Sequence, residues 1–233
     1  MKLLSTGNPK LMKGEKKGYL SFVLHLAPSD LSGYNTCPMA SAGCRAACLN
    51  TAGRGGLFKK GETTNTIQTA RIRKTRMFFE NRAEFISQLV ADIRLGIRQA
   101  EKLGMIPAFR LNGTSDIPWE NVPVNDATNI MSLFPNVQFY DYTKRENRRN
   151  LPANYHLTLS RSETNEVACF TPSQPYNVAV VFNSKVLPTE YKGRPVVNGD
   201  DTDLRFLDPV GVVVGLTAKG KAKKDPSGFT VPV

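Results

Sequence analysis

Long apolar runs are missing from this sequence of 233 residues, so no segment is long enough to span a bilayer as a helix. The first nine residues, from Met1 to Pro9, contain no apolar stretch of the length that a signal peptide needs. We therefore expect a protein without membrane contact that works in a reducing cytoplasm. Internal repeats and low-complexity tracts are missing too, so the length predicts a single domain over residues 1–233.

Motifs for nucleotides and for common hydrolases are also absent. The sequence has no Gly-x-x-x-x-Gly-Lys-Ser/Thr loop and no Gly-x-Gly-x-x-Gly turn after a strand, so no nucleotide cofactor is indicated. Only two histidines occur, His25 and His156, and neither lies in a recognisable nucleophile motif. His156 lies inside an apolar strand, where packing is its ordinary role. His25 ends a strand just before the cysteines and is a candidate neighbour of whatever they bind.

Four cysteines are present, and three of them crowd into one loop. Cys37, Cys44 and Cys48 fall within twelve residues, whereas Cys169 lies far downstream. The surrounding segment, residues 37–61, contains five glycines and few apolar residues that could pack the thiols. In a reducing compartment such a cluster favours a metal over disulfides. This cysteine-rich loop is therefore the strongest candidate site.

The spacing of the cysteines decides between metals. Zinc sites usually show two close pairs of ligands, and only one interval here, Cys44-x3-Cys48, is of that kind. Iron–sulfur clusters accept three thiolates on one loop with a distant fourth. We therefore predict a 4Fe–4S cluster held by Cys37, Cys44, Cys48 and Cys169, with zinc or free cysteines as the alternatives. A radical enzyme that uses S-adenosylmethionine would present Cys-x3-Cys-x2-Cys, which is not the spacing found.

The pattern of strands and helices predicts an α/β fold. Residues 62–103 carry apolar side chains at helical spacing, with Asn81 as an internal cap and Gly104 as the end, and a second helical segment is expected at 125–134. The candidate strands are residues 19–26, 106–112, 137–142, 155–160, 177–182, 195–198 and 210–216. Alternating units of this kind predict a parallel sheet, here a partial or distorted TIM-like barrel.

In a parallel β/α fold the site lies where the strands end. Three predicted strand ends carry compact polar sets, and the cysteine loop follows a fourth. Turns also contain such residues for structural reasons alone. The candidate pocket residues are Asn112, Asp116, Tyr142, Lys144, Ser160 and Arg161.

The charge is strongly basic, with 31 Lys and Arg against 20 Asp and Glu and a formal net charge of +11. Solvated helix faces explain much of such an excess, and no groove-reading motif is present. A polyanionic partner is the alternative. The candidate nucleic-acid contacts are Arg71, Arg73, Lys74, Arg76, Arg148 and Arg149.

From about Leu20 to Val231 the sequence resembles the bacteriophage gene product eighty-eight family. The segments that carry the resemblance are Cys37-Pro-Met-Ala-Ser with Cys48, residues 110–116, residues 139–144, residues 159–162 and the ending of residues 216–229. The resemblance implies a phage protein made in the cytoplasm of a bacterial host. It also implies a layout similar to that of radical S-adenosylmethionine barrels.

These observations lead to one functional expectation and two alternatives. We expect a phage iron–sulfur protein with a role in redox chemistry, electron transfer or structure, whose partner is a host redox protein. The first alternative is a radical S-adenosylmethionine-like enzyme. The second is a basic phage protein that binds nucleic acid.

Overall fold

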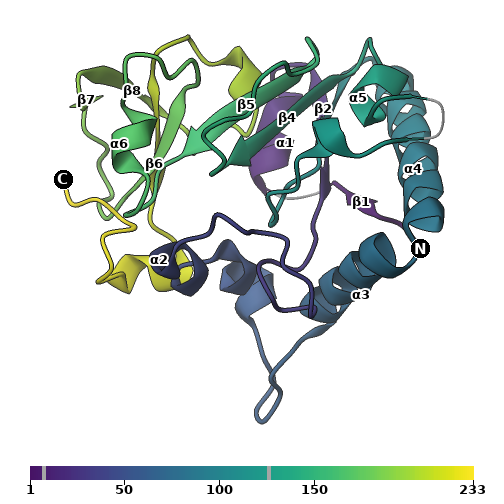
Figure 1. Cartoon of the computed structure of the whole chain (residues 1–233), viewed down its shortest axis with the longest axis horizontal. Helices are drawn as coiled ribbons and strands as arrows, with labels where there is room; N and C mark the ends of the chain where they lie inside the picture. The colour runs from purple at the N-terminus through teal and green to yellow at the C-terminus, as the bar shows by residue number, and fades with distance from the viewer. Residues whose placement is uncertain (7–8, 125–126) are drawn as a thin grey trace.

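The computed structural model describes residues 1–6, 9–124 and 127–233, which form one nine-stranded sheet with helices packed on it (Figure 1). The strands are β1 (Leu4–Ser5), β2 (Tyr19–Leu24), β3 (Ile106–Arg110), β4 (Gln138–Thr143), β5 (Tyr155–Ser160), β6 (Val178–Phe182), β7 (Glu190–Tyr191), β8 (Arg194–Asn198) and β9 (Val213–Thr217). Their order across the sheet is β1-β2-β3-β4-β5-β6-β9-β8-β7. All seven of the longer predicted strands are present within a few residues of their predicted bounds.

The sheet is mostly parallel and open. Neighbours from β2 through to β8 run parallel, while β1 and β7 add to the two edges antiparallel. In the described part of the chain β1 and β7 do not pair with each other, so no closed barrel forms. The sheet stays open for two reasons. Strand order follows chain order only from β1 to β6, because β9 lies between β6 and β8. The two edge strands, β1 and β7, are also only two residues long.

Two long helices form from the segment predicted to be helical. α3 (Thr66–Glu80) begins after Asn65, whose side-chain oxygen accepts a hydrogen bond from the backbone N–H of Gln68 at 3.0 Å. Asn81 separates α3 from α4 (Arg82–Lys102), and Gly104, at φ +65°, follows the end of α4. The second predicted helix is short, because α5 covers only Ile130–Leu133, and residues 125–126 of that prediction lie outside the described residues.

One face of the sheet, which we call the apolar face, packs against α4. Alternate residues of each strand point to it, and α4 contributes Ile86, Leu89, Val90 and Ile93, as its spacing predicted. Gly96 lets the sheet approach the helix, since a Cβ there would lie 3.1 Å from both Phe22 and Phe109. The strand residues buried on this face are Leu20, Phe22, Leu24, Phe109, Phe139, Leu157, Leu159, Val178, Val180, Phe182 and Val213.

The opposite face, which we call the polar face, is made by the intervening residues. It carries Ser21, Arg110, Tyr140, Tyr142, His156 and Thr158. α1 (Pro9–Glu15) and the segment of η4 (Arg205–Leu207) cover this face, and the ring of Phe206 packs edge-on against those of Tyr19 and Tyr140. Asp203 accepts a hydrogen bond from Arg110 at 2.9 Å and one from Tyr140 at 3.4 Å. The sequence did not reveal α1, in which Gly14 packs against Leu204.

The loops after the strands meet at the carboxyl edge of the parallel sheet. The cysteine loop contains α2 (Ala42–Ala46), η1 (Leu49–Thr51) and η2 (Gly53–Gly56), and Figure 1 shows it below the strands beside the C-terminal segment with η5 (Gly220–Lys224). The remaining short helices are η3 (Trp119–Asn121) and α6 (Glu166–Cys169). Among the helices of the described residues, none has the length and apolar character needed to cross a membrane.

Candidate functional site

The cysteine loop is tied to the loops that follow two strands of the parallel sheet, β3 and β5. The thiol of Cys37 lies 3.7 Å from the backbone oxygen of Thr114, in the loop after β3. Ser41 caps α2 by accepting a hydrogen bond from the backbone N–H of Cys44 at 3.1 Å. Glu163, in the loop after β5, accepts hydrogen bonds from Ser41 and from the backbone N–H of Gly43, both at 2.8 Å. The loop is therefore fixed over the carboxyl edge of the sheet.

Three thiols share one electrostatic environment in this loop. Burial raises the pKa of Cys37, Cys44 and Cys48, and the pKa values of Cys37 and Cys48 are raised further by the other thiols of the set. Two cations act in the opposite direction: Lys144 lowers the pKa of Cys44, and Arg71 lowers that of Cys48. The structure thus brings together three of the four predicted ligands, with a positive charge beside two of them.

Cys169 lies in a different environment. Its side chain is fully buried on the apolar face, where it packs in one cluster with Leu159, Val178, Val180, Phe182 and Val213. Burial raises the pKa of its thiol to about 12, and the neighbouring charges that act on it most belong to Lys144, Glu146, Arg161 and Glu166 rather than to cysteines. Cys169 is thus more deeply buried than the three thiols of the loop, and it shares the influence of Lys144 with Cys44.

No preformed site for a single metal ion is found among the described residues. A structural zinc ion needs four donors at about 2.0–2.3 Å from one centre. Among the described residues no group of three or more His, Cys, Asp and Glu side chains is placed to hold one metal ion.

Two of the six candidate pocket residues organise the loops. The side chain of Asn112 is buried and accepts hydrogen bonds from the backbone N–H of Ile117 at 2.9 Å and from the indole of Trp119 at 3.3 Å. Asp116, also buried, accepts from the hydroxyl of Thr143 at 2.8 Å and from the backbone N–H of Lys144 at 2.9 Å. These two residues hold the loop after β3 together and against the end of β4.

The other four candidates lie around the cysteines and the polar face. Lys144 is directed to Cys44 and lies 5.3 Å from the ring centre of Phe229. Tyr142 lies beneath Arg110, whose guanidinium is 4.7 Å from the tyrosine ring centre. Arg161 donates hydrogen bonds to the backbone oxygens of Gly228 and Phe229, and Ser160 provides a backbone acceptor for Asn165 at 3.1 Å.

The C-terminal segment is part of the site, which motif reasoning missed. Gly43 in α2 has no room for a side chain, since a Cβ there would meet Ser227 at 2.1 Å and Phe229 at 2.8 Å. Ala47 packs with Ala218 and Ala222 of the same segment. The only signal in the sequence was the Lys- and Gly-rich ending, because the burial of these small residues depends on contacts far apart in the chain.

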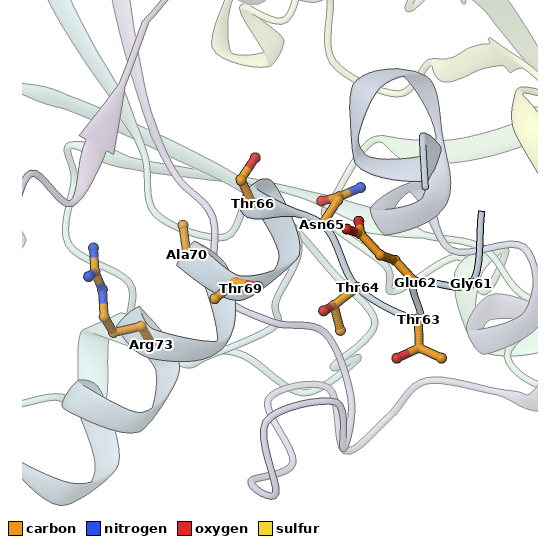
Figure 2. A pocket seen from close by; sticks show the side chains of 9 residues that line it. All are labelled: Gly61, Glu62, Thr63, Thr64, Asn65, Thr66, Thr69, Ala70 and Arg73. Carbon is orange, nitrogen blue, oxygen red and sulfur yellow. The ribbon is translucent and has the colours of Figure 1, made fainter. Parts of the chain in front are cut away.

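The six predicted nucleic-acid contacts differ in their exposure. Arg73, Arg76 and Arg149 are exposed, whereas Arg71 and Lys74 are half-buried. Arg148 is only 5% exposed and pairs with Glu120 inside the fold. A hollow of about 630 Å³ lies at the start of α3 and is lined by residues 61–66, Thr69, Ala70 and Arg73, whose side chains Figure 2 shows. Its hydroxyl-bearing side chains are mostly exposed, and Arg73 lies at its end.

The two histidines have different surroundings. Burial and the positive charges of Arg71, Arg110 and Lys74 lower the pKa of His25 to about 3. His25 follows β2 directly and is half-buried. His156 lies in β5 on the polar face, and burial and the charge of Arg205 lower its pKa. Both imidazoles are therefore neutral at physiological pH.

Comparison with known proteins gives one match. A family model described as gene product 88 matches residues 2–232, which is nearly the whole chain. No curated protein and no solved structure matches the sequence.

Proposed function

This chain belongs to the gene product 88 family, and we propose that it is an iron–sulfur protein whose cluster is bound by Cys37, Cys44 and Cys48. The observation that carries the proposal is the gathering of these three half-buried thiols in one loop, which hydrogen bonds fix over the carboxyl edge of a parallel sheet. Cluster iron prefers thiolate ligands, and one loop supplies all three. A bound cluster would supply one-electron redox chemistry.

The residues around the thiols suit a bound anionic centre. Burial keeps the three thiols protonated in the free protein, so ligation would release protons. Lys144 and Arg71 lie beside Cys44 and Cys48 and would offset the charge of the thiolates. Burial at this edge would also limit contact of the cluster with water.

The position of Cys169 favours a centre with one non-cysteine ligand. A 4Fe–4S cluster with four cysteines is coordinatively closed, which suits electron transfer. With Cys169 in the apolar core, the fourth iron would be left to another ligand, which is the arrangement of a radical S-adenosylmethionine-like enzyme. The consecutive parallel strands β2 to β6 are consistent with a distorted, open relative of that barrel, and the electrons would come from a host redox protein.

Cluster content in cysteine variants tests the proposal. The protein purified without oxygen is expected to be brown and to contain iron and sulfide. Cys37→Ala, Cys44→Ala and Cys48→Ala should each lose most of the iron. The matched control is Cys169→Val, which keeps an apolar side chain in the core and should retain the cluster.

Two results would contradict the proposal. A wild-type protein that remains colourless after anaerobic reconstitution with iron and sulfide has no cluster site. Loss of iron from a Cys169→Val variant that circular dichroism shows to be folded would mean that Cys169 is a fourth ligand of the cluster.

A further inference from the structure

Two arginines with unused donors lie on the elements beside His25, one of them in contact with the cysteine loop. Arg71 of α3 donates to the side-chain oxygen of Asn50 at 2.5 Å, and Arg110 of β3 pairs with Asp203 at 2.9 Å. In each guanidinium the Nε–H is buried and has no hydrogen-bond partner among the described residues. A buried N–H of a charged group without a partner costs free energy, so each position calls for an acceptor.

A third unused group lies beside Arg110. The hydroxyl of Tyr142 is buried and lacks a partner in the part of the chain that the structure describes, although its ring is stacked under Arg110. The side chains are still reachable, since Arg110 is 18% exposed and both Arg71 and Tyr142 are half-buried. The two guanidinium groups are positively charged hydrogen-bond donors, and the hydroxyl of Tyr142 can also donate.

The local electrostatics show an excess of positive charge at this place. His25 lies two residues after Val23, which pairs with Arg110 of β3, and two residues before Ala27, whose backbone N–H donates to Thr75, one turn after Arg71 in α3. Arg71, Arg110 and Lys74 all lower the pKa of His25, and Asp203 raises it less. Asp203 is already engaged with Arg110, Lys10 and Tyr140. The positive potential around His25 is therefore not neutralised by the protein's own carboxylates.

We propose that Arg71, Arg110 and Tyr142 form a binding site for an oxyanion, namely a carboxylate or phosphate group of a small-molecule ligand, beside Cys48. Arginine presents planar N–H groups that match both kinds of oxyanion, and a tyrosine hydroxyl adds a neutral donor. Because Arg71 also acts on Cys48, the ligand would lie next to the proposed cluster. The site is separate from the cluster ligands, so it stands even if no cluster binds.

Calorimetric titration of the full chain with simple anions tests the site. The protein is titrated with inorganic phosphate in one arm and with malonate in the other, at an ionic strength held constant with sodium chloride. We expect one saturable site for at least one of the two anions. Binding to phosphate alone would identify a phosphate-bearing ligand, and binding to malonate alone would identify a carboxylate.

Three variants locate the binding. Arg71→Gln removes the charge and should weaken the affinity about tenfold or more, because a charged hydrogen bond is lost. Tyr142→Phe removes only a hydroxyl that makes no internal hydrogen bond, so it should keep the fold and weaken the affinity a few-fold. The matched control is Arg73→Gln, the same change of charge at an exposed position of α3, which should bind like the wild type.

Three outcomes would overturn the proposal: no saturable heat with either anion, unchanged affinity in both Arg71→Gln and Tyr142→Phe, or an equal loss in Arg73→Gln. The last would mean that diffuse surface charge attracts the anion. The cluster proposal is tested by colour and iron content, not by calorimetry. A colourless protein that binds phosphate would therefore contradict the cluster and support this site.

Discussion

The apolar and polar faces of the sheet are built from alternate residues of the same strands, and they differ in how completely their groups are satisfied. On the apolar face Phe109 is fully buried and packs against Phe22 and Phe139. On the polar face its neighbour Arg110 pairs with Asp203 but keeps an unpartnered Nε–H among the described residues. The apolar side chain is thus fully packed by its neighbours, whereas the polar side chain keeps a hydrogen-bond donor that no described residue uses.

The difference shows how one strand can serve both stability and chemistry. Burial of aromatic side chains against α4 supplies free energy that does not depend on direction. The polar face instead needs specific partners for each donor and acceptor, because an unsatisfied buried group is costly. Residues that remain unsatisfied there, such as Tyr142, are the places where a ligand can contribute.

Truncation on the apolar face should have the largest effect on stability. Phe109→Ala removes a fully buried ring, so the free energy of unfolding should fall by about 3–5 kcal/mol. The control Ile106→Ala, in the same strand but 54% exposed, should change it by no more than about 0.5 kcal/mol. Urea denaturation measures both changes in the free energy of unfolding. Equal changes would contradict the conclusion that Phe109 is buried and Ile106 is exposed.

A polar-face variant that keeps its shape should have a smaller but clear effect. Asp203→Asn removes the charge that faces Arg110 and Lys10, and we expect a loss of about 2–3 kcal/mol because the cations lose their buried partner. Asp201→Asn, at an exposed position two residues earlier, is the matched control. An Asp203→Asn variant as stable as the control in urea denaturation would show that the polar face tolerates unpaired charge.

Much of the fold could be predicted because its signals are local. The apolar spacing in α4, the break at Asn81 and the bounds of β5 follow from neighbouring residues. The position of β9 between β6 and β8 could not be predicted, because strand order depends on contacts between distant segments. The two-residue edge strands β1 and β7 are too short to leave a periodic pattern.

In the candidate site too, the features set by neighbouring residues could be predicted, and those set by distant contacts could not. Closeness in the sequence was enough to place Cys37, Cys44 and Cys48 together. Cys169 and Arg148 are buried by elements that are distant in the sequence. Counting thiols or charges along the chain therefore could not predict their burial. The role of the C-terminal segment over α2 was hidden for that reason too.

The smallest expected change for a single experimental step, at most about 1.4 kcal/mol for one pH unit, comes from the titration of Asp141. Asp141 is fully buried and accepts hydrogen bonds from the backbone N–H of Asn112 at 2.6 Å and from Tyr155 at 2.8 Å. Burial raises its pKa to about 7, although Arg110, Arg148 and these hydrogen bonds oppose the rise. The folded protein therefore holds a proton that the unfolded chain, with an ordinary pKa near 3.8, releases.

Stability should fall as the pH rises from about 4 to about 7, since the folded state binds more protons in that window. One proton limits this contribution to a slope of about 1.4 kcal/mol per pH unit. His25 and His156 act in the opposite direction, because their lowered pKa values make the folded state bind fewer protons than the unfolded chain. Comparing urea denaturation of the wild type and Asp141→Asn at pH 5, 6 and 7 isolates the carboxyl, since both proteins share the histidines. The stability of the wild type relative to the variant should decline across the series, and parallel curves would mean that Asp141 is ionised throughout.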